Sequence, residues 1–340
     1  MPIDTPPRLS ALFLSAGARL SIVIFAIVLS ACDGRQSALN TAGRAAERIA
    51  ELFWWMVAGG FIIWLLVVAL AVYSIHLRPV KEHPRLAAWL ILGGGAVFPV
   101  VVLAVLLVSG LAMMPHLRVP PDGADLEISV SGEQWWWRVR YHTPAGPVDL
   151  ANEIRLPVNR RALFLLTSPD VIHSFWIPPL GGKMDMLPGR TTRLVLEPLR
   201  TGEFRGVCAE YCGASHAFMG FPVRVTTQEA FDAWLEAQRA PAVVPTGALE
   251  RRGQQAFLAN GCGACHSVRG TAADGRVGPD LTHVGSRLSL GAGVLANTHA
   301  EFTRWIAQTG QVKPGVHMPS FGMLPEHDIN AIARYLESLQ

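Results

Sequence analysis

Two long uncharged segments constrain the fold of this chain more than any other feature. Residues 52–75 and 87–114 contain no Asp, Glu, Lys or Arg. A helix rises about 1.5 Å per residue, so each segment can cross the hydrocarbon core of a bilayer, roughly 30 Å thick. Tryptophans near the start of both segments suit the membrane interface. We therefore predict a transmembrane helix hairpin at about these positions, within residues 32–117.

The first 31 residues resemble an export signal. A short apolar run at 20–29 follows two arginines and is too short to span a bilayer comfortably. The sequence Leu29-Ser30-Ala31-Cys32 then resembles a lipoprotein signal-peptidase site. We interpret residues 1–31 as a lipoprotein signal peptide and Cys32 as the lipidated first residue of the mature chain. The alternative is an unmodified cysteine at the end of a hydrophobic leader.

The composition indicates a membrane environment and no nucleic-acid partner. Half of the residues are hydrophobic, 16% are charged, and the net charge is only +3. So small a charge leaves no electrostatic footprint for nucleic acid, whereas membrane lipid is an expected partner. The connection between the apolar segments carries Arg78, Lys81 and Arg85, so the positive-inside rule places it in the cytoplasm.

From residue 125 the pattern changes to that of short strands. Leu126, Ile128 and Val130 alternate with polar residues, as in a half-buried strand. Further β-rich runs occupy residues 153–158, 162–167, 193–197 and 221–226. Strands at such spacing predict a Greek-key sandwich or barrel, closed by a helix at 228–239. We assign residues 118–239 to this domain and the proline-containing residues 240–247 to a linker.

A dense cluster of soft metal ligands lies within twelve residues of this domain, namely Cys208, Cys212, His216 and Met219. Thiolate, thioether and imidazole together select copper. One cysteine would suit a blue-copper site, but two thiolates can bridge two copper ions. His173, on a loop between predicted strands, is the candidate for the second imidazole. Met219 and the carbonyl of Glu210 would be weak ligands. The alternative for the two cysteines is a disulfide or a pair of buried thiols.

Residues 170–174 and 208–219 resemble the copper-binding motifs of cytochrome c oxidase subunit II, Asp-Val-x-His-Ser and Cys-x-Glu-x-Cys-x-x-x-His-x-x-Met. The resemblance runs from about residue 50 to residue 226. It implies a cupredoxin-like fold, a CuA centre of two copper ions, and assembly with subunit I and other oxidase subunits. It also implies that Trp135 receives electrons from cytochrome c. The Glu210 side chain would bind a magnesium or manganese ion shared with subunit I.

The sequence Cys262-Gly263-Ala264-Cys265-His266 is a c-type haem attachment motif. Two thioether bonds would fix one haem c through Cys262 and Cys265, and His266 would be its proximal ligand. The alternative, a zinc site, needs a second pair of ligands, and the sequence has no further cysteine near this motif. Because such haems are attached outside the cytoplasm, the C-terminal half is expected on the periplasmic side of a bacterial inner membrane, after a multi-pass anchor.

Residues 248–340 resemble a small all-α class I cytochrome c, with helices expected at 248–260, 301–308 and 326–339. The resemblance implies that the Pro279 carbonyl orients His266. It also implies that Met318, in a Met-Pro turn, is the distal ligand, with His317 and Met323 as rivals. A Met/His ligand pair raises the haem potential, as an electron acceptor on an oxidase requires.

These features indicate subunit II of a caa-type respiratory cytochrome c oxidase with a fused cytochrome c domain. Electrons would pass from the haem to CuA and then to the haem a and copper site in subunit I, where oxygen is reduced. This chain would hold no catalytic residue for oxygen reduction. The donor would be a soluble or membrane-bound cytochrome c, or a bc complex. A copper carrier would use a thioredoxin-like fold, nitric oxide reductase subunits lack the copper loop, and quinol oxidase subunits have lost the ligands. Nitrous oxide reductases carry a large His-rich domain that is absent here.

Overall fold

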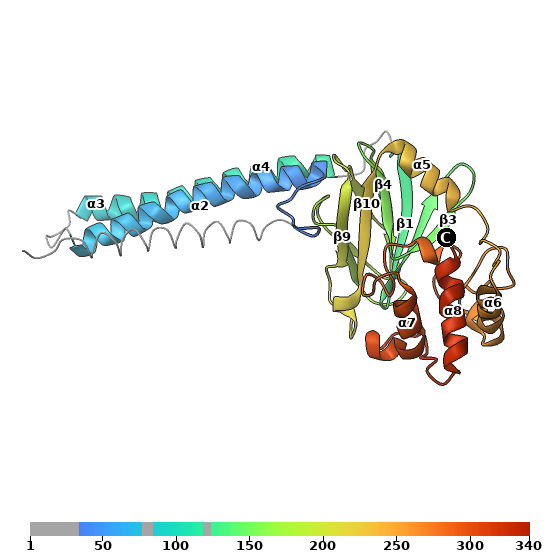
Figure 1. The fold of residues 1–340 in the computed structure, drawn as a ribbon. Helices are drawn as coiled ribbons and strands as arrows, with labels where there is room; N and C mark the ends of the chain where they lie inside the picture. Colours follow the sequence, from blue (N-terminus) through green and yellow to red (C-terminus); the bar gives the residue numbers. More distant parts are fainter. Residues whose placement is uncertain (1–33, 77–83, 118–123) are drawn as a thin grey trace, which may run out of the picture.

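The computed structural model describes residues 34–76, 84–117 and 124–340. The predicted signal peptide at 1–31 and the predicted lipidation site at Cys32 lie outside the described residues. Figure 1 shows a helical hairpin that projects from a head made of a β sandwich and a group of helices. The predicted arrangement of two apolar helices, a β domain and a helical C-terminal domain is confirmed.

The hairpin consists of α2 (Arg44–His76) and a second helical segment. The second segment contains α3 (Pro84–Trp89), the π-helix η1 (Leu90–Val97) and α4 (Phe98–Leu117). Both helical arms are long and apolar enough to cross a membrane, and no residue in the apolar stretch of either arm is buried. Three consecutive glycines in η1 lack the side chains that would favour regular α-helical packing, and the π-helix occurs at this position.

The β domain is a sandwich of two five-stranded sheets, within the described residues. One sheet has the order β3-β2-β1-β5-β8 and the other β4-β10-β9-β6-β7. The first contains β1 (Leu126–Glu133), β2 (Trp136–His142), β3 (Val148–Ala151), β5 (Ala162–Thr167) and β8 (Thr192–Leu196). The second contains β4 (Ile154–Pro157), β6 (His173–Trp176), β7 (Met184–Met186), β9 (Gly202–Cys208) and β10 (Gly220–Thr226). Strands β1 and β5 pair in parallel, as do β4 and β10.

An aromatic core joins the two sheets directly behind the predicted copper ligands. Phe175 of β6 stacks on Phe221 of β10 at 5.0 Å between ring centroids, and Trp137 of β2 packs edge-on against both rings. All three side chains are at most 1% exposed. Burial of rings this large contributes strongly to domain stability. The core therefore provides a rigid base for the ligand-bearing ends of β6, β9 and β10.

The predicted strands agree closely with the structure, but the strands β3, β6, β7 and β9 were not predicted. The run at 162–167 coincides with β5, and the helix predicted at 228–239 is α5 (Gln228–Ala237). The placement of His173 on a loop was wrong, because this residue begins β6. Its strand is four residues long and its first three residues are buried, so it has no alternating pattern that the sequence could show.

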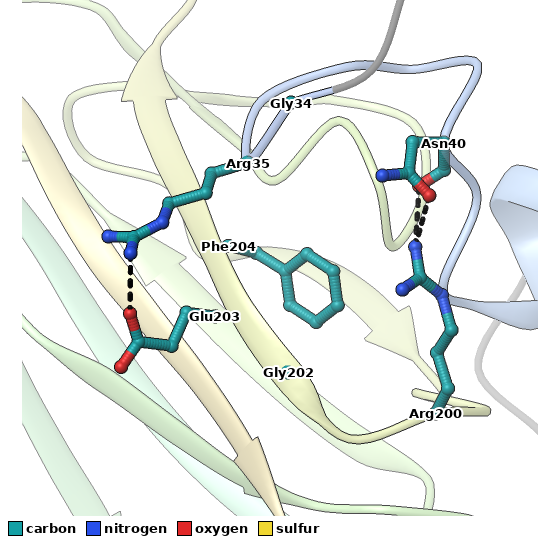
Figure 2. A pocket seen from close by; sticks show the side chains of 7 residues that line it. All are labelled: Gly34, Arg35, Asn40, Arg200, Gly202, Glu203 and Phe204. Carbon is teal, nitrogen blue, oxygen red and sulfur yellow. Dashed lines mark hydrogen bonds and ion pairs between the residues drawn. The ribbon is translucent and has the colours of Figure 1, made fainter.

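The segment that leads from residue 34 into the hairpin contacts the β sandwich through several polar pairs. The Arg44 guanidinium forms two hydrogen bonds with the Glu197 carboxylate, at 2.7 and 2.8 Å. Figure 2 shows Arg35 paired with Glu203, at 3.0 Å, and Arg200 paired with Asn40 on the other side of the Phe204 ring. These contacts surround a cavity of about 300 Å³. None of the described residues that line this cavity is a predicted copper or haem ligand.

The C-terminal domain is built from α6 (Ala248–Ala259), α7 (His299–Val312) and α8 (Glu326–Ser338). Short 3₁₀ turns, η3 (Cys262–Ala264) and η4 (Val284–Ser286), connect them. Gly253 allows α6 and α8 to cross closely, since a Cβ at this position would lie 1.9 Å from the Ala331 carbonyl oxygen. Helix α7 extends four residues beyond the predicted 301–308, with a kink at Gln308. The helices lie beside the β sandwich, as Figure 1 shows.

Candidate metal centres

The residues predicted to bind copper converge at one end of the β sandwich. The Cys208 and Cys212 sulfur atoms lie 3.8 Å apart, and the Cys212 sulfur lies 3.8 Å from the Met219 sulfur. The His216 Nδ1 atom is 3.6 Å from the Cys212 sulfur, and the His173 Nδ1 atom is 3.9 Å from the Cys208 sulfur. The Glu210 carbonyl oxygen is 3.1 Å from the Cys208 sulfur. One compact group thus contains two thiols, two imidazoles, a thioether and a carbonyl.

The two cysteines are not a disulfide. Their sulfur atoms are 3.8 Å apart, whereas a disulfide bond is about 2.05 Å long. Both are free thiols and at most 6% exposed. The ligand atoms of Cys208, Cys212 and His173 all lie within 4.8 Å of one another, which suits a metal ion. The geometry therefore favours the metal-binding interpretation of this pair over the structural alternatives.

Backbone hydrogen bonds hold the ligand loop in place. Strand β9 ends at Cys208, and β10 begins directly after Met219. The Cys208 amide donates to the Met219 carbonyl at 3.1 Å, which closes the base of the loop. The Ala209 amide donates to the Ser174 carbonyl at 2.9 Å and ties the loop to β6. These hydrogen bonds therefore fix the backbone that carries Cys208 and Met219 at the ends of β9 and β10.

Asp170 orients His173 from the side remote from the sulfur atoms. Its carboxylate lies 2.8 Å from His173 Nε2, so Nδ1 faces the thiols. Burial lowers the pKa of His173, but hydrogen bonds with Cys208 and Asp170 outweigh burial and leave the pKa raised. Burial likewise opposes ionisation of Asp170, yet hydrogen bonds from His173 and two backbone amides leave its pKa lowered. A carboxylate behind a ligating imidazole fixes its tautomer and orientation.

The two thiols differ strongly in acidity. The hydrogen bond from Cys212 is the main cause that lowers the pKa of Cys208, to about 3, and His173 and the Glu210 carbonyl contribute further. The pKa of Cys212 is raised, first by the same hydrogen bond and then by burial. Binding of a metal ion by thiols releases their protons.

Trp135 lies against the copper-ligand loop and is only 7% exposed. Its indole nitrogen donates to the Cys212 carbonyl at 2.9 Å, and the Gln134 side-chain amide donates to the same oxygen at 2.7 Å. Trp137, two residues later, is a core residue whose indole donates to the Met219 carbonyl at 3.3 Å. Within this aromatic cluster, Trp137 packs in the core, whereas Trp135 also contacts the loop that carries the predicted copper ligands.

The C-terminal domain brings the predicted haem-attachment residues together. Cys262 and Cys265 are free thiols, and Cys265 is exposed. The His266 Nδ1 atom donates to the Pro279 carbonyl at 2.8 Å, so Nε2 is left for a metal. Burial lowers the pKa of His266, which keeps the imidazole neutral. A Cβ at Gly278 would lie 2.5 Å from the His266 ring, so only glycine leaves room for this orientation.

Two buried polar groups near this motif were not predicted from the sequence. Arg287 Nε and Ser289 Oγ are buried and have no hydrogen-bond partner among the described residues. Arg287 also acts electrostatically on His266. Buried polar groups are normally satisfied, so orphaned donors indicate an acidic or hydrogen-bonding group that belongs here. The carboxylates of a haem fit this requirement. Arg269 and Arg276 also follow the motif, so the sequence did not single out Arg287.

The predicted distal ligand and its rivals differ in exposure. Met318 is half-buried, whereas His317 is exposed and Met323 is 76% exposed. All three lie in the connection between α7 and α8. A side chain directed into solvent cannot also ligate a buried iron, so burial favours Met318 over Met323.

The two metal-site regions meet at an interface that the sequence did not reveal. Lys313 of the C-terminal domain donates to the Trp135 carbonyl at 2.6 Å. Ser215, in the copper-ligand loop, donates to the Pro314 carbonyl at 2.5 Å. Arg138 of β2 donates to the Arg276 carbonyl at 3.1 Å, beside the loop that orients His266. The segment that carries Met318 is therefore in direct contact with the segment that carries the copper ligands.

Two family matches divide the chain as the fold does. The family described as cytochrome c oxidase subunit II, periplasmic domain, matches residues 143–226, and the cytochrome c family matches residues 250–340. These matches imply copper in the β domain and haem c in the C-terminal domain. The molecule is therefore a membrane protein with a periplasmic domain. It transfers electrons as one part of an oxidoreductase.

Individual relatives assign the chain to a narrower family. Cytochrome c oxidase subunit 2 of Alkalihalophilus pseudofirmus is 37% identical over 242 residues, or 71% of this chain and 69% of the relative. The protein of the same name from Bacillus sp. strain PS3 is 35% identical over 230 residues, or 64% of each chain. The chain thus spans about two thirds of the length of these relatives. It belongs to the cytochrome c oxidase subunit 2 family.

A solved structure is also similar to part of this chain. The periplasmic domain of subunit II of cytochrome oxidase from Bradyrhizobium japonicum is 34% identical, with a TM-score of 0.33. The match covers 36% of this chain and 97% of the solved chain.

Proposed function

We propose that this chain is a caa-type subunit II that passes electrons from its own haem c to a dinuclear CuA centre and onward to subunit I. The observation that carries the proposal is the convergence of six copper-type ligands within one compact group. Membership of the cytochrome c oxidase subunit 2 family supports an electron-transfer role in an oxidase. Oxygen reduction would take place in subunit I, and this chain would contribute electron transfer.

The donor set fits two copper ions. Cys208 and Cys212 would bridge the metals through their thiolates, because their sulfur atoms lie side by side at the centre of the group. His173 lies next to the Cys208 sulfur and His216 next to the Cys212 sulfur, and each would bind one copper through Nδ1. The Met219 thioether and the Glu210 carbonyl would complete the two coordination shells as weak ligands. When bound, the copper pair supplies one-electron redox chemistry, and soft ligands favour copper.

The C-terminal residues fit a covalently bound haem c. Cys262 and Cys265 would form the two thioether bonds, and His266 would bind the iron through Nε2, held there by the Pro279 carbonyl. Met318 would be the distal ligand. The orphaned Arg287 Nε and Ser289 Oγ would bind haem carboxylates. A Met/His-ligated haem has a raised potential, which suits an acceptor between a periplasmic donor and copper.

Trp135 would carry electrons between the two centres. It contacts the Cys212 peptide on one side and the C-terminal domain on the other. Because it is only 7% exposed, the direct donor to this tryptophan would be the haem domain of the same chain. An external cytochrome c or bc complex would then reduce the haem.

Glu210 and the hairpin would connect the chain to its surroundings. The Glu210 side chain is exposed and forms a long ion pair with the Lys183 ammonium, at 4.0 Å. It would bind a magnesium or manganese ion shared with subunit I. The apolar helices would cross the bacterial inner membrane twice and contact lipid, subunit I and other oxidase subunits. Residues 118–239 and 248–340 would be the copper and haem domains, joined by the linker at 240–247.

The test is a metal count and an electron paramagnetic resonance spectrum of the full-length protein, matured for haem and loaded with copper. Two coppers per haem, with one unpaired electron shared equally by both copper nuclei, would support the proposal. A single copper with a localised signal, or copper that passes readily to acceptor proteins, would favour a carrier. A matched Cys212→Ser variant should bind at most one copper and lose the shared signal.

A further inference from the structure

Lys313 is a buried lysine that joins the two domains. Its side chain is 1% exposed, and its amine donates to the Trp135 carbonyl at 2.6 Å and the Gly291 carbonyl at 2.9 Å. Trp135 belongs to the copper domain and Gly291 to the haem domain. Lysines are rarely buried without a carboxylate partner. Burial lowers the pKa of Lys313 to about 7, and even the neutral amine has two hydrogens for these two carbonyls.

The residues after Lys313 continue the same contact. A Cβ at Gly315, whose φ is +80°, would lie 2.9 Å from the Trp135 ring, so the backbone rests directly on the indole. The Pro314 carbonyl accepts a hydrogen bond from Ser215 at 2.5 Å. Val316 packs against the core of the copper domain. Residues 313–316, which we call the docking segment, therefore cover Trp135 and end two residues before Met318.

We propose that Lys313 is a positioning residue that seats the docking segment on Trp135 and so fixes the haem domain where it can deliver electrons to the copper site. This inference rests on the proposed function. The Lys313 amine donates to Trp135 and Gly291 rather than to a predicted metal ligand, and its charge also interacts with Cys212. Its structural contact with the copper site runs through Trp135, whose indole nitrogen donates to the Cys212 carbonyl.

The geometry distinguishes this role from ordinary packing. A lysine that only filled a gap within one domain would find its acceptors in that domain, whereas this amine bridges one carbonyl from each domain. Removing it would leave the Trp135 and Gly291 carbonyls buried without their donor. Unsatisfied buried acceptors oppose the docked state, so the undocked fraction should rise about ten- to a hundredfold.

The test compares Lys313→Met with the wild type in the full-length protein loaded with haem and copper. Methionine keeps much of the stem but donates no hydrogen bond. Arg252→Met is the matched control, because Arg252 is an exposed cation that pairs with Asp328 inside the haem domain at 3.1 Å. Gly315→Ala is a second variant, which pushes the docking segment off Trp135 without altering Lys313. The rate of amide hydrogen exchange at 134–136 and 313–316 reports whether the two domains are docked. The rate of copper reduction after flash reduction of the haem measures electron transfer.

Lys313→Met and Gly315→Ala should both speed exchange in these segments and slow haem-to-copper transfer, with the haem and copper spectra unchanged. Arg252→Met should match the wild type in both readouts. Wild-type exchange and wild-type transfer rates in both docking variants would overturn the inference. Failure of the proposed function would instead show in the wild-type spectra, as missing haem or copper. Hydrogen exchange would still report docking in a copper-free chain.

Discussion

The Trp135 indole nitrogen donates a hydrogen bond to the Cys212 carbonyl oxygen at 2.9 Å. This contact joins an aromatic ring covered by the haem domain to the backbone of a predicted bridging copper ligand. The Trp135 peptide carbonyl, on the other side, accepts from Lys313. Trp135 therefore contacts both domains of the proposed electron path. A substitution at Trp135 tests whether electrons pass between the domains at this point.

Trp135→Phe should slow haem-to-copper transfer while copper content stays at the wild-type level. Phenylalanine keeps an aromatic ring but removes the indole donor, at a cost of about 1 kcal/mol in stability. Trp136→Phe is the control, because the Trp136 ring packs against the Arg138 guanidinium, 4.6 Å from the ring centroid. Flash reduction of the haem gives both rates. Equal rates in the two variants would show that Trp135 has no special role.

Asp170→Asn should shift the pH dependence of copper uptake. The pKa of His173 is raised, so its protonated ring competes with copper, and uptake should fall as the pH drops through that raised value. Asparagine removes one cause of the raised pKa. The midpoint of uptake by copper-free protein should therefore move to lower pH. Asp149→Asn, which alters an exposed pair with Arg140, should leave the midpoint unchanged. A midpoint that stays constant or rises in Asp170→Asn would contradict the role given to Asp170.

Phe175→Ala should destabilise the β domain by about 3–5 kcal/mol. Phe175 is fully buried, contacts Trp137 and Phe221, and lies two residues after His173. The cavity should loosen β6, so copper affinity should fall as well. Denaturant unfolding and copper titration measure the two effects. Phe175→Leu should cost less because it fills more of the space. Wild-type stability in the alanine variant would mean that the aromatic core does not support the site.

Arg287→Met should lower the haem potential. A buried positive charge near the iron favours the reduced state, and its removal favours the oxidised state. Redox titration of the haem band measures the change, with the exposed Arg304→Met as control. An unchanged haem potential, together with normal haem incorporation, would show that Arg287 does not bind the haem carboxylates.

The sequence predicted the parts of the molecule whose signals are local. Both apolar arms were found from uninterrupted hydrophobic runs, and the copper loop from the spacing between Cys208 and Met219. The strand that carries His173 was missed because four mostly buried residues show no alternation. The contact between Lys313 and Trp135 joins residues 178 positions apart, so no window along the chain could show it. The burial of Trp135 follows from that contact and was hidden for the same reason.

The most direct test of the account is the kinetics of copper reduction after flash reduction of the haem in the full-length protein. The account predicts a first-order transfer whose rate is independent of protein concentration, because donor and acceptor belong to one chain and are docked. A rate that rises in proportion to protein concentration, or copper that stays oxidised, would contradict it.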